Sequence, residues 1–198
     1  MRIPIYKICS CENSRWYENS LSSGVRVRVP LGAPTKGNQM FKLDLDEVKE
    51  FILNTSPSSK IYLGCDSERI LHKNIWYADY TVAVVIHKDG KHGCKLFGEM
   101  IREKDFDQKE NRPRFRLMNE VYKVSQLYLD LAVCFGDRHV EVHLDINPNE
   151  MYGSSCVINE AIGYIRGTCN VIPMVKPKAF AATCAADRYK DVRNLQLA

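Results

Sequence analysis

The chain has 198 residues, which suits one domain with an appendage and leaves little room for two full domains. Hydrophobic residues make up 45% and charged residues 26%, so the composition excludes a disordered chain and allows one sizeable core. With 28 Lys and Arg against 24 Asp and Glu, the net charge of +4 is compatible with a polyanionic partner but does not require one.

The N-terminal residues lack the apolar run of a signal peptide, and no stretch approaches the roughly 18 apolar residues of a membrane helix. The eight cysteines never form a C-x-x-C pair, and most lie in apolar segments where a reduced thiol packs as a small hydrophobe. The one close pair, Cys9 and Cys11, is weak evidence for a metal. We therefore predict a cytoplasmic protein with no membrane partner and no cysteine-based zinc site.

Residues 1–41 are predicted to form an irregular N-terminal arm, and residues 42–198 the main domain. Within the arm, the alternation over 25–29 favours a strand whose basic face, Arg26 and Arg28, is either solvated or in contact with phosphate. A helix is predicted over 44–53, because apolar residues recur there at helical spacing and acidic residues occupy the first turn.

Three consecutive antiparallel strands are predicted next, over 60–65, 78–87 and 94–101. Each is rich in apolar and β-branched residues. The dipeptide Asp89-Gly90 between the second and third strands is a strong hairpin signal.

The remainder of the chain alternates between helices and strands. A long amphipathic helix is predicted over 116–135, with Pro113 placed to open it, because apolar residues follow one another at spacings of four and three. A helix over 154–169 has Ser154 or Ser155 as its expected cap. The other elements are strands over 139–144 and 171–175 and an alanine-rich helix over 178–191.

Four acidic residues occupy positions that favour a shared site. Asp66 and Asp145 each follow an apolar strand, and Glu120 and Asp187 lie at the border of apolar helical segments. Individually, each has an ordinary explanation as a turn former, a solvated helix residue or a partner in a local ion pair. Together, converging carboxylates without a basic cluster would repel one another, and divalent cations relieve that repulsion; oxygen ligands favour Mg²⁺ or Mn²⁺ over zinc.

The order β-β-β-α-β-α-β-α, with these acids at its first strand, first helix, fourth strand and last helix, resembles the ribonuclease H-like fold. Several segments resemble more narrowly the YkuK-like family of bacterial and phage proteins, from about residue 42 to 190. They are Ile61–Ser67, Val140–Ile146, Ser154-Ser155 with Gly163-Tyr164, and Lys176–Ala182 with Ala186–Arg188. The resemblance implies an α/β fold with a mixed five-stranded sheet of order 3-2-1-4-5, strand 2 antiparallel, flanked by helices.

The resemblance also implies a metal-dependent nuclease that hydrolyses phosphodiester bonds, with RNA or an RNA/DNA hybrid as the favoured substrate. Two Mg²⁺ or Mn²⁺ ions would then be held by Asp66, Glu120, Asp145 and Asp187, with Asp66 between them. Candidate contacts to substrate phosphate are the basic residues Lys176, Lys178, Arg114 and Arg116. His143, on the opposite strand face from Val142 and Leu144, is either a packed or a functional residue.

Two other functions stay open on the sequence alone. One is a catalytically silent ribonuclease H-like module that binds nucleic acid or a protein partner. The other, weaker one is a metal-dependent hydrolase of nucleotides or other phosphoesters, which the small net charge leaves open.

Overall fold

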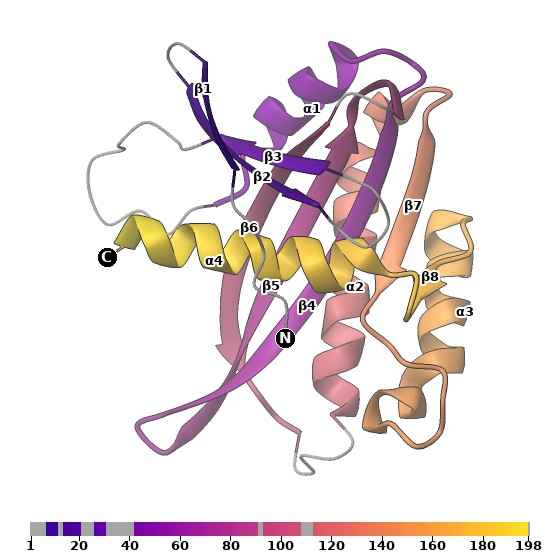
Figure 1. Cartoon of the computed structure of the whole chain (residues 1–198). Coiled ribbons are helices and arrows are strands. Elements are labelled where there is room, and N and C mark those ends of the chain that lie inside the picture. The colour runs from indigo at the N-terminus through magenta and orange to yellow at the C-terminus, as the bar shows by residue number, and fades with distance from the viewer. Residues whose placement is uncertain are drawn as a thin grey trace.

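The computed structural model of the chain, shown in Figure 1, describes residues 7–11, 14–20, 26–30, 42–90, 93–107 and 113–197. The strands are β1 (Lys7–Cys11), β2 (Ser14–Ser20), β3 (Arg26–Pro30), β4 (Lys60–His72), β5 (Ile75–His87), β6 (Cys94–Lys104), β7 (His139–Leu144) and β8 (Met174–Val175). The helices are α1 (Leu45–Leu53), α2 (Arg114–Phe135), α3 (Ile158–Cys169) and α4 (Ala186–Leu197), with short turns η1 (Lys88–Gly90), η2 (Gly153–Val157) and η3 (Ala181–Ala185).

The central sheet has the order β6-β5-β4-β7-β8, which is 3-2-1-4-5 in chain order. β5 pairs antiparallel with both β4 and β6, whereas β7 pairs parallel with β4 and β8. The predicted fold class is therefore confirmed. β4 and β5 are longer than predicted because they continue to a two-residue turn, Lys73–Asn74, in which both residues have positive φ, as tight hairpins require.

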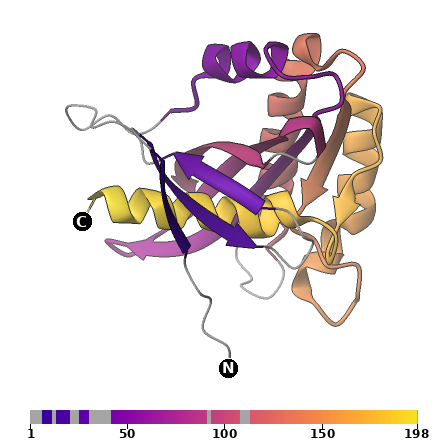
Figure 2. The same ribbon diagram turned by 45° about the horizontal axis from the view of Figure 1, so that its top comes forward.

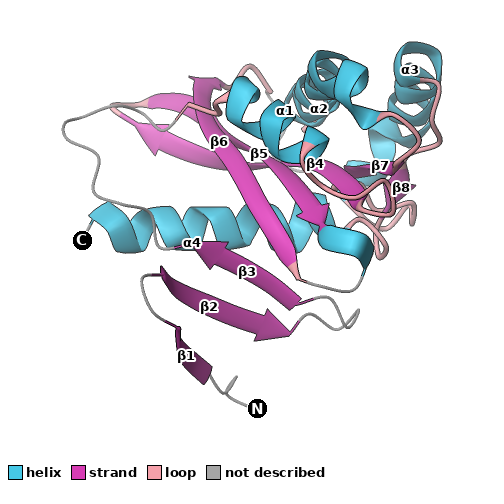
Figure 3. Cartoon of the chain, turned by 90° about the horizontal axis from the view of Figure 1, so that it is seen from above, coloured by secondary structure: helices cyan, strands magenta, loops and turns pink. Residues whose placement is uncertain are grey.

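β1, β2 and β3 extend the sheet beyond β6, with Val27 opposite Cys94 in a parallel pair. In Figure 2 and Figure 3 these three strands lie on the side of the sheet where α4 runs. Of the three, the sequence predicted only the strand over 25–29. The expectation of an otherwise irregular arm is therefore wrong for residues 7–11 and 14–20, whose mostly polar residues lack the apolar alternation that marks a strand.

The helices cover the two faces of the sheet unequally. Figure 3 shows α1, α2 and α3 together on one face and α4 on the other. The main core lies between the sheet and α2, around Leu63, Val84, Val124, Leu131 and Val142, all fully buried. None of the described helices is long and apolar enough to cross a membrane.

Two helix starts differ from the prediction. Ser154 and Ser155 lie inside the 3-10 turn η2 rather than capping α3, because the chain tightens for one turn before the helix begins. The last helical segment opens with η3, a π-helical turn, and α4 follows it directly.

Gly64 allows η3 to lie against the sheet. A Cβ atom at Gly64 would come within 2.4 Å of the Ala181 carbonyl carbon and of the Ala182 nitrogen, which is closer than real contacts allow. The backbone of η3 therefore touches the backbone of β4 at this point, and η3 and α4 can carry polar side chains to Asp66 on β4 and to Asp145 after β7.

We expect Gly64→Ala to destabilise the protein by about 1–3 kcal/mol, because the added methyl group must push η3 away from β4. Urea unfolding measures the change. Gly163→Ala is the matched control: a Cβ there meets nothing within 4 Å and lies in α3, so we expect unchanged or slightly higher stability. Equal stability of Gly64→Ala and the wild type would contradict the close packing of η3.

Candidate active site

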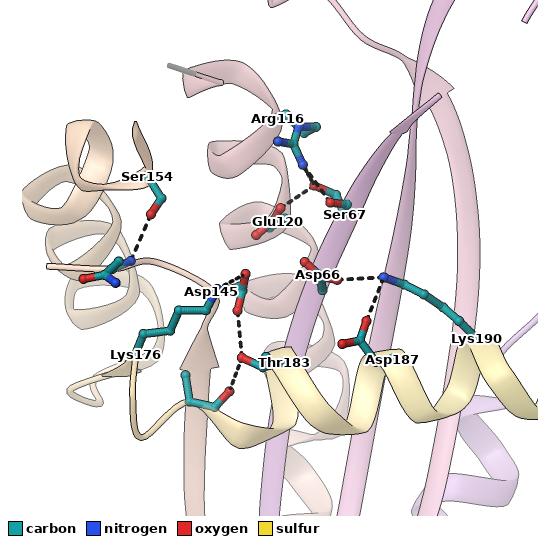
Figure 4. A network of polar contacts seen from close by, with 12 residues as sticks. Asp66, Ser67, Arg116, Glu120, Asp145, Ser154, Lys176, Thr183, Asp187 and Lys190 are labelled. Atoms are coloured by element: carbon teal, nitrogen blue, oxygen red, sulfur yellow. Dashed lines mark hydrogen bonds and ion pairs between the residues drawn. The ribbon is translucent and has the colours of Figure 1, made fainter. Parts of the chain in front are cut away.

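The register of β4 and β7 places two predicted acids side by side. Cys65 on β4 pairs with Leu144 on β7, so the residues that follow them, Asp66 and Asp145, lie next to each other at the end of β7. Parallel strands present their carboxyl ends at one edge of the sheet, the usual place for a site in an α/β protein. Figure 4 shows both side chains at this edge.

Glu120 approaches the same edge from α2 and is only 3% exposed. The Ser67 hydroxyl donates a hydrogen bond to Oε1 of Glu120. The Arg116 guanidinium, one turn earlier on α2, donates through Nη1 to the Ser67 carbonyl oxygen at 2.7 Å and to the Ser67 hydroxyl at 2.8 Å. These bonds fix Glu120 beside Asp66, although Glu120 itself has no ion pair among the described residues.

Asp187 reaches the site from the other face of the sheet, on the first turn of α4, with its side chain 62% exposed. It is linked to Asp66 through Lys190. The Lys190 ammonium lies 2.7 Å from Oδ2 of Asp66 and 3.3 Å from Oδ1 of Asp187 (Figure 4).

Asp145 is held by two further side chains. The Thr183 hydroxyl, on the π-helical turn, donates to Oδ1 at 2.7 Å, and the Lys176 ammonium lies 2.8 Å from Oδ2. Both oxygens of Asp145 therefore have a partner, and the carboxylate has a fixed orientation at the end of β7.

The pKa values of Asp66 and Glu120 are raised in part by the charges of neighbouring acids. Burial raises the pKa of Asp66, and the neighbouring Asp145 and Asp187 raise it further, while Lys190 opposes the shift. Burial also raises the pKa of Glu120 well above its ordinary value, with the charge of Asp66 as the next cause. Mutual repulsion in a desolvated place is what a bound cation would relieve.

A cleft of about 970 Å³ opens over these acids. Its walls include Asp66, Glu120 and Asp145 from the acidic centre, Arg116 and Lys176 as basic groups, and the loop Glu150–Cys156. Met151 and Tyr152 of that loop are exposed. The Nε of Arg116 is buried and has no hydrogen-bond partner in the described part of the chain.

His143 is packed rather than open to the cleft. It is fully buried, its Nδ1 accepts a 3.0 Å hydrogen bond from the Ala181 backbone N–H, and its Nε2 lies 3.0 Å from Glu141. Because Nδ1 is the acceptor, Nε2 carries the proton and donates to Glu141. Burial lowers the pKa of His143, although Glu141 opposes the shift. His143 therefore ties η3 to the sheet.

The donor set partly fits a divalent cation. Carboxylate oxygens are the ligands that Mg²⁺ and Mn²⁺ prefer. Oδ1 of Asp66 and Oε2 of Glu120 accept no hydrogen bond from the residues that the structure describes, so both are available as ligands. Over the same residues, no group of three acidic, histidine or cysteine side chains is gathered closely enough to form a metal cage. An ion would have to draw the carboxylates together.

The predicted substrate contacts separate into two pairs. Lys176 and Arg116 line the cleft. Arg114 instead pairs with Glu160 at 2.8 Å on the surface, and Lys178 is exposed, so neither contacts the acidic centre and their role stays a prediction.

Sequence reasoning missed three residues that hold the acids in place: Ser67, Thr183 and Lys190. The available signal for Lys190 was its position three residues after Asp187, which places both on one helix face.

Comparison with known proteins gives one match. The family model described as Ribonuclease H-like matches residues 44–191, which contain all four predicted acids. No curated protein and no solved structure matches the chain.

Proposed function

This chain belongs to the ribonuclease H-like family, and we propose that it is a metal-dependent nuclease that hydrolyses phosphodiester bonds, with RNA or an RNA/DNA hybrid as its substrate. The single observation that carries the proposal is the meeting of Asp66, Glu120 and Asp145 at one cleft, with Asp187 attached through Lys190. Mutually repelling acids in a partly desolvated cleft are costly to a fold, so their presence together favours a catalytic role.

In this proposal the acids hold two Mg²⁺ or Mn²⁺ ions. The ions would activate the attacking water and stabilise the leaving 3′ oxygen, which yields 5′-phosphate and 3′-hydroxyl ends. Asp66 lies between Glu120 and Asp187 and supplies a carboxylate to both sides of the centre. Asp145, fixed by Thr183, completes the side that faces the cleft.

The cleft itself supports binding of a phosphate chain. Arg116 lines the cleft beside Glu120, and a guanidinium can donate to a phosphate through more than one nitrogen. Lys176 is 35% exposed where it meets Asp145, so its ammonium can also approach a phosphate from the cleft side.

The test is a cleavage panel. Single-stranded RNA, double-stranded RNA, an RNA/DNA hybrid and single-stranded DNA, each labelled at the 5′ end, are incubated with the protein in Mg²⁺, in Mn²⁺ or in EDTA. We expect cleavage of at least one RNA-containing substrate in either metal and none in EDTA. Cleavage that persists in EDTA, or attack on DNA alone, would contradict the proposal.

One observation favours a second function, a catalytically silent module that binds nucleic acid or a protein partner. The ammonium groups of Lys190 and Lys176 already partner Asp66, Asp187 and Asp145 without any metal. Gel-shift assays on the same substrates separate the two functions, because retention without cleavage in any metal would replace the nuclease with the binding module.

A further inference from the structure

Lys190 is more enclosed than Lys176, the other lysine that forms ion pairs with the acids of this centre. Its side chain is 15% exposed, against 35% for Lys176 at Asp145. From α4 its ammonium reaches Oδ2 of Asp66 at 2.7 Å and Oδ1 of Asp187 at 3.3 Å, and so it bridges two carboxylates that are far apart in the chain.

The ammonium neutralises this side of the centre. A lysine side chain is protonated at neutral pH, and Lys190 forms ion pairs with both Asp66 and Asp187.

The two carboxylate oxygens of Asp66 differ in their hydrogen bonding. Oδ2 is bonded to Lys190, whereas Oδ1 accepts no hydrogen bond among the described residues, and the same holds for Oε2 of Glu120. A divalent ion can approach the Glu120 side without displacing an ammonium from Asp66. On the Asp187 side it would compete with a fixed cation that already contacts both carboxylates.

We propose that Lys190 is a positioning residue that occupies the place of the second cation, between Asp66 and Asp187, so that the free chain binds one divalent ion on the Glu120 side. A second ion enters only when a substrate phosphate offers the Lys190 ammonium an alternative partner. This inference rests on the proposed metal centre and concerns how that centre is filled.

The test counts bound ions rather than turnover. Titration with Mn²⁺, followed by the electron paramagnetic resonance signal of the free ion, is expected to give one ion per chain for the wild type. Lys190→Met keeps the alkyl stem but removes the charge, and we expect it to bind two. In EDTA, Lys190→Met is expected to unfold at a temperature about 2–4 °C lower, because Asp66 and Asp187 lose their counter-charge, and Mn²⁺ should restore the loss.

Two further variants serve as checks. Lys60→Met removes the same charge from an exposed lysine at the start of β4, and we expect its ion count to stay at one. Lys190→Gln removes the charge but keeps a donor group, and we expect it to bind two ions as Lys190→Met does. If Lys190→Met does not fold, judged by circular dichroism, this second variant provides the test.

Each outcome has one meaning. Two ions on the wild type, or one ion on both the wild type and the Lys190 variants, would overturn the role of Lys190 and leave the nuclease proposal standing. No ion on any variant would overturn the metal centre itself. The titration contains no nucleic acid, so the number of bound ions can be interpreted even if the cleavage panel identifies no substrate.

Discussion

Asp145→Asn is expected to reduce metal-dependent cleavage by about 100- to 1,000-fold, which corresponds to about 3–4 kcal/mol of transition-state stabilisation. The amide has nearly the shape of the carboxylate but lacks its charge, so it cannot take its place as an anionic ligand in the centre. It can still accept the hydrogen bond from Thr183, whereas its NH₂ group cannot serve as an acceptor for Lys176.

The fold should survive this change. Asp145 lies at the end of β7, outside the apolar core, and thermal unfolding is expected to stay within a few degrees of the wild type. Asp137→Asn, an exposed aspartate in the turn before β7, is the matched control and should keep full activity. A fully active Asp145→Asn protein would refute the assignment, and activity lost equally in both variants would indicate a general defect rather than a role of Asp145.

Glu120→Gln is expected to lower activity by a similar factor while raising the stability of the metal-free protein at neutral pH by roughly 1–2 kcal/mol, a range typical of stabilising substitutions. The reason is the buried charge. Glu120 is 3% exposed, and burial together with Asp66 raises its pKa well above 4.5, so the charged form opposes folding. Glutamine keeps the acceptor for the Ser67 hydroxyl without that charge.

The pH dependence has a definite sign. Because the folded-state pKa of Glu120 lies above the unfolded value, the folded chain binds more protons between the two. The contribution of Glu120 to stability is present below about pH 4.5 and is lost as pH rises through the folded-state pKa. The wild type should therefore lose more stability than Glu120→Gln between pH 5 and neutrality, as measured by urea unfolding in EDTA.

The matched control is Glu50→Gln, on the exposed face of α1, which should follow the wild type at every pH. Some slope should remain in Glu120→Gln, because the pKa of Asp66 is raised as well. Identical pH profiles of stability for the wild type and Glu120→Gln would show that the buried charge of Glu120 does not oppose folding.

Much of the fold could be predicted because the apolar residues of this chain follow the spacing of strands and helices. An aspartate follows each of the apolar runs over 60–65 and 139–144. This pattern predicted the end of β7 correctly, whereas β4 continues past Asp66 to His72. The stripe of α2 placed Glu120 at the border of its buried face, and the structure buries it. These signals are local, so one sequence suffices to detect them.

The remaining features depend on contacts between distant segments. The bond between Lys190 and Asp66 joins residues 124 positions apart, and the bond between Thr183 and Asp145 joins residues 38 apart. A lone lysine or threonine on a helix carries no sign of such a partner. The same limit applies to β1 and β2, whose pairing with each other and with β3 compensates for weak strand propensity.

The π-helical turn η3 determines the direction in which the side chains of α4 point. Each residue of an α-helix advances the side chain by about 100°, and a π turn accommodates one residue more than an α turn. Thr183 lies within η3, whereas Asp187 and Lys190 follow it on α4. Removing a single residue from 181–185 would therefore rotate Asp187 and Lys190 together by about a quarter turn relative to the strands, while all four acids remained in the sequence. For this centre, the number of residues between the point where η3 packs on Gly64 and the start of α4 matters as much as side-chain identity. A one-residue deletion there would move Asp187 and Lys190 away from Asp66 without changing any ligand.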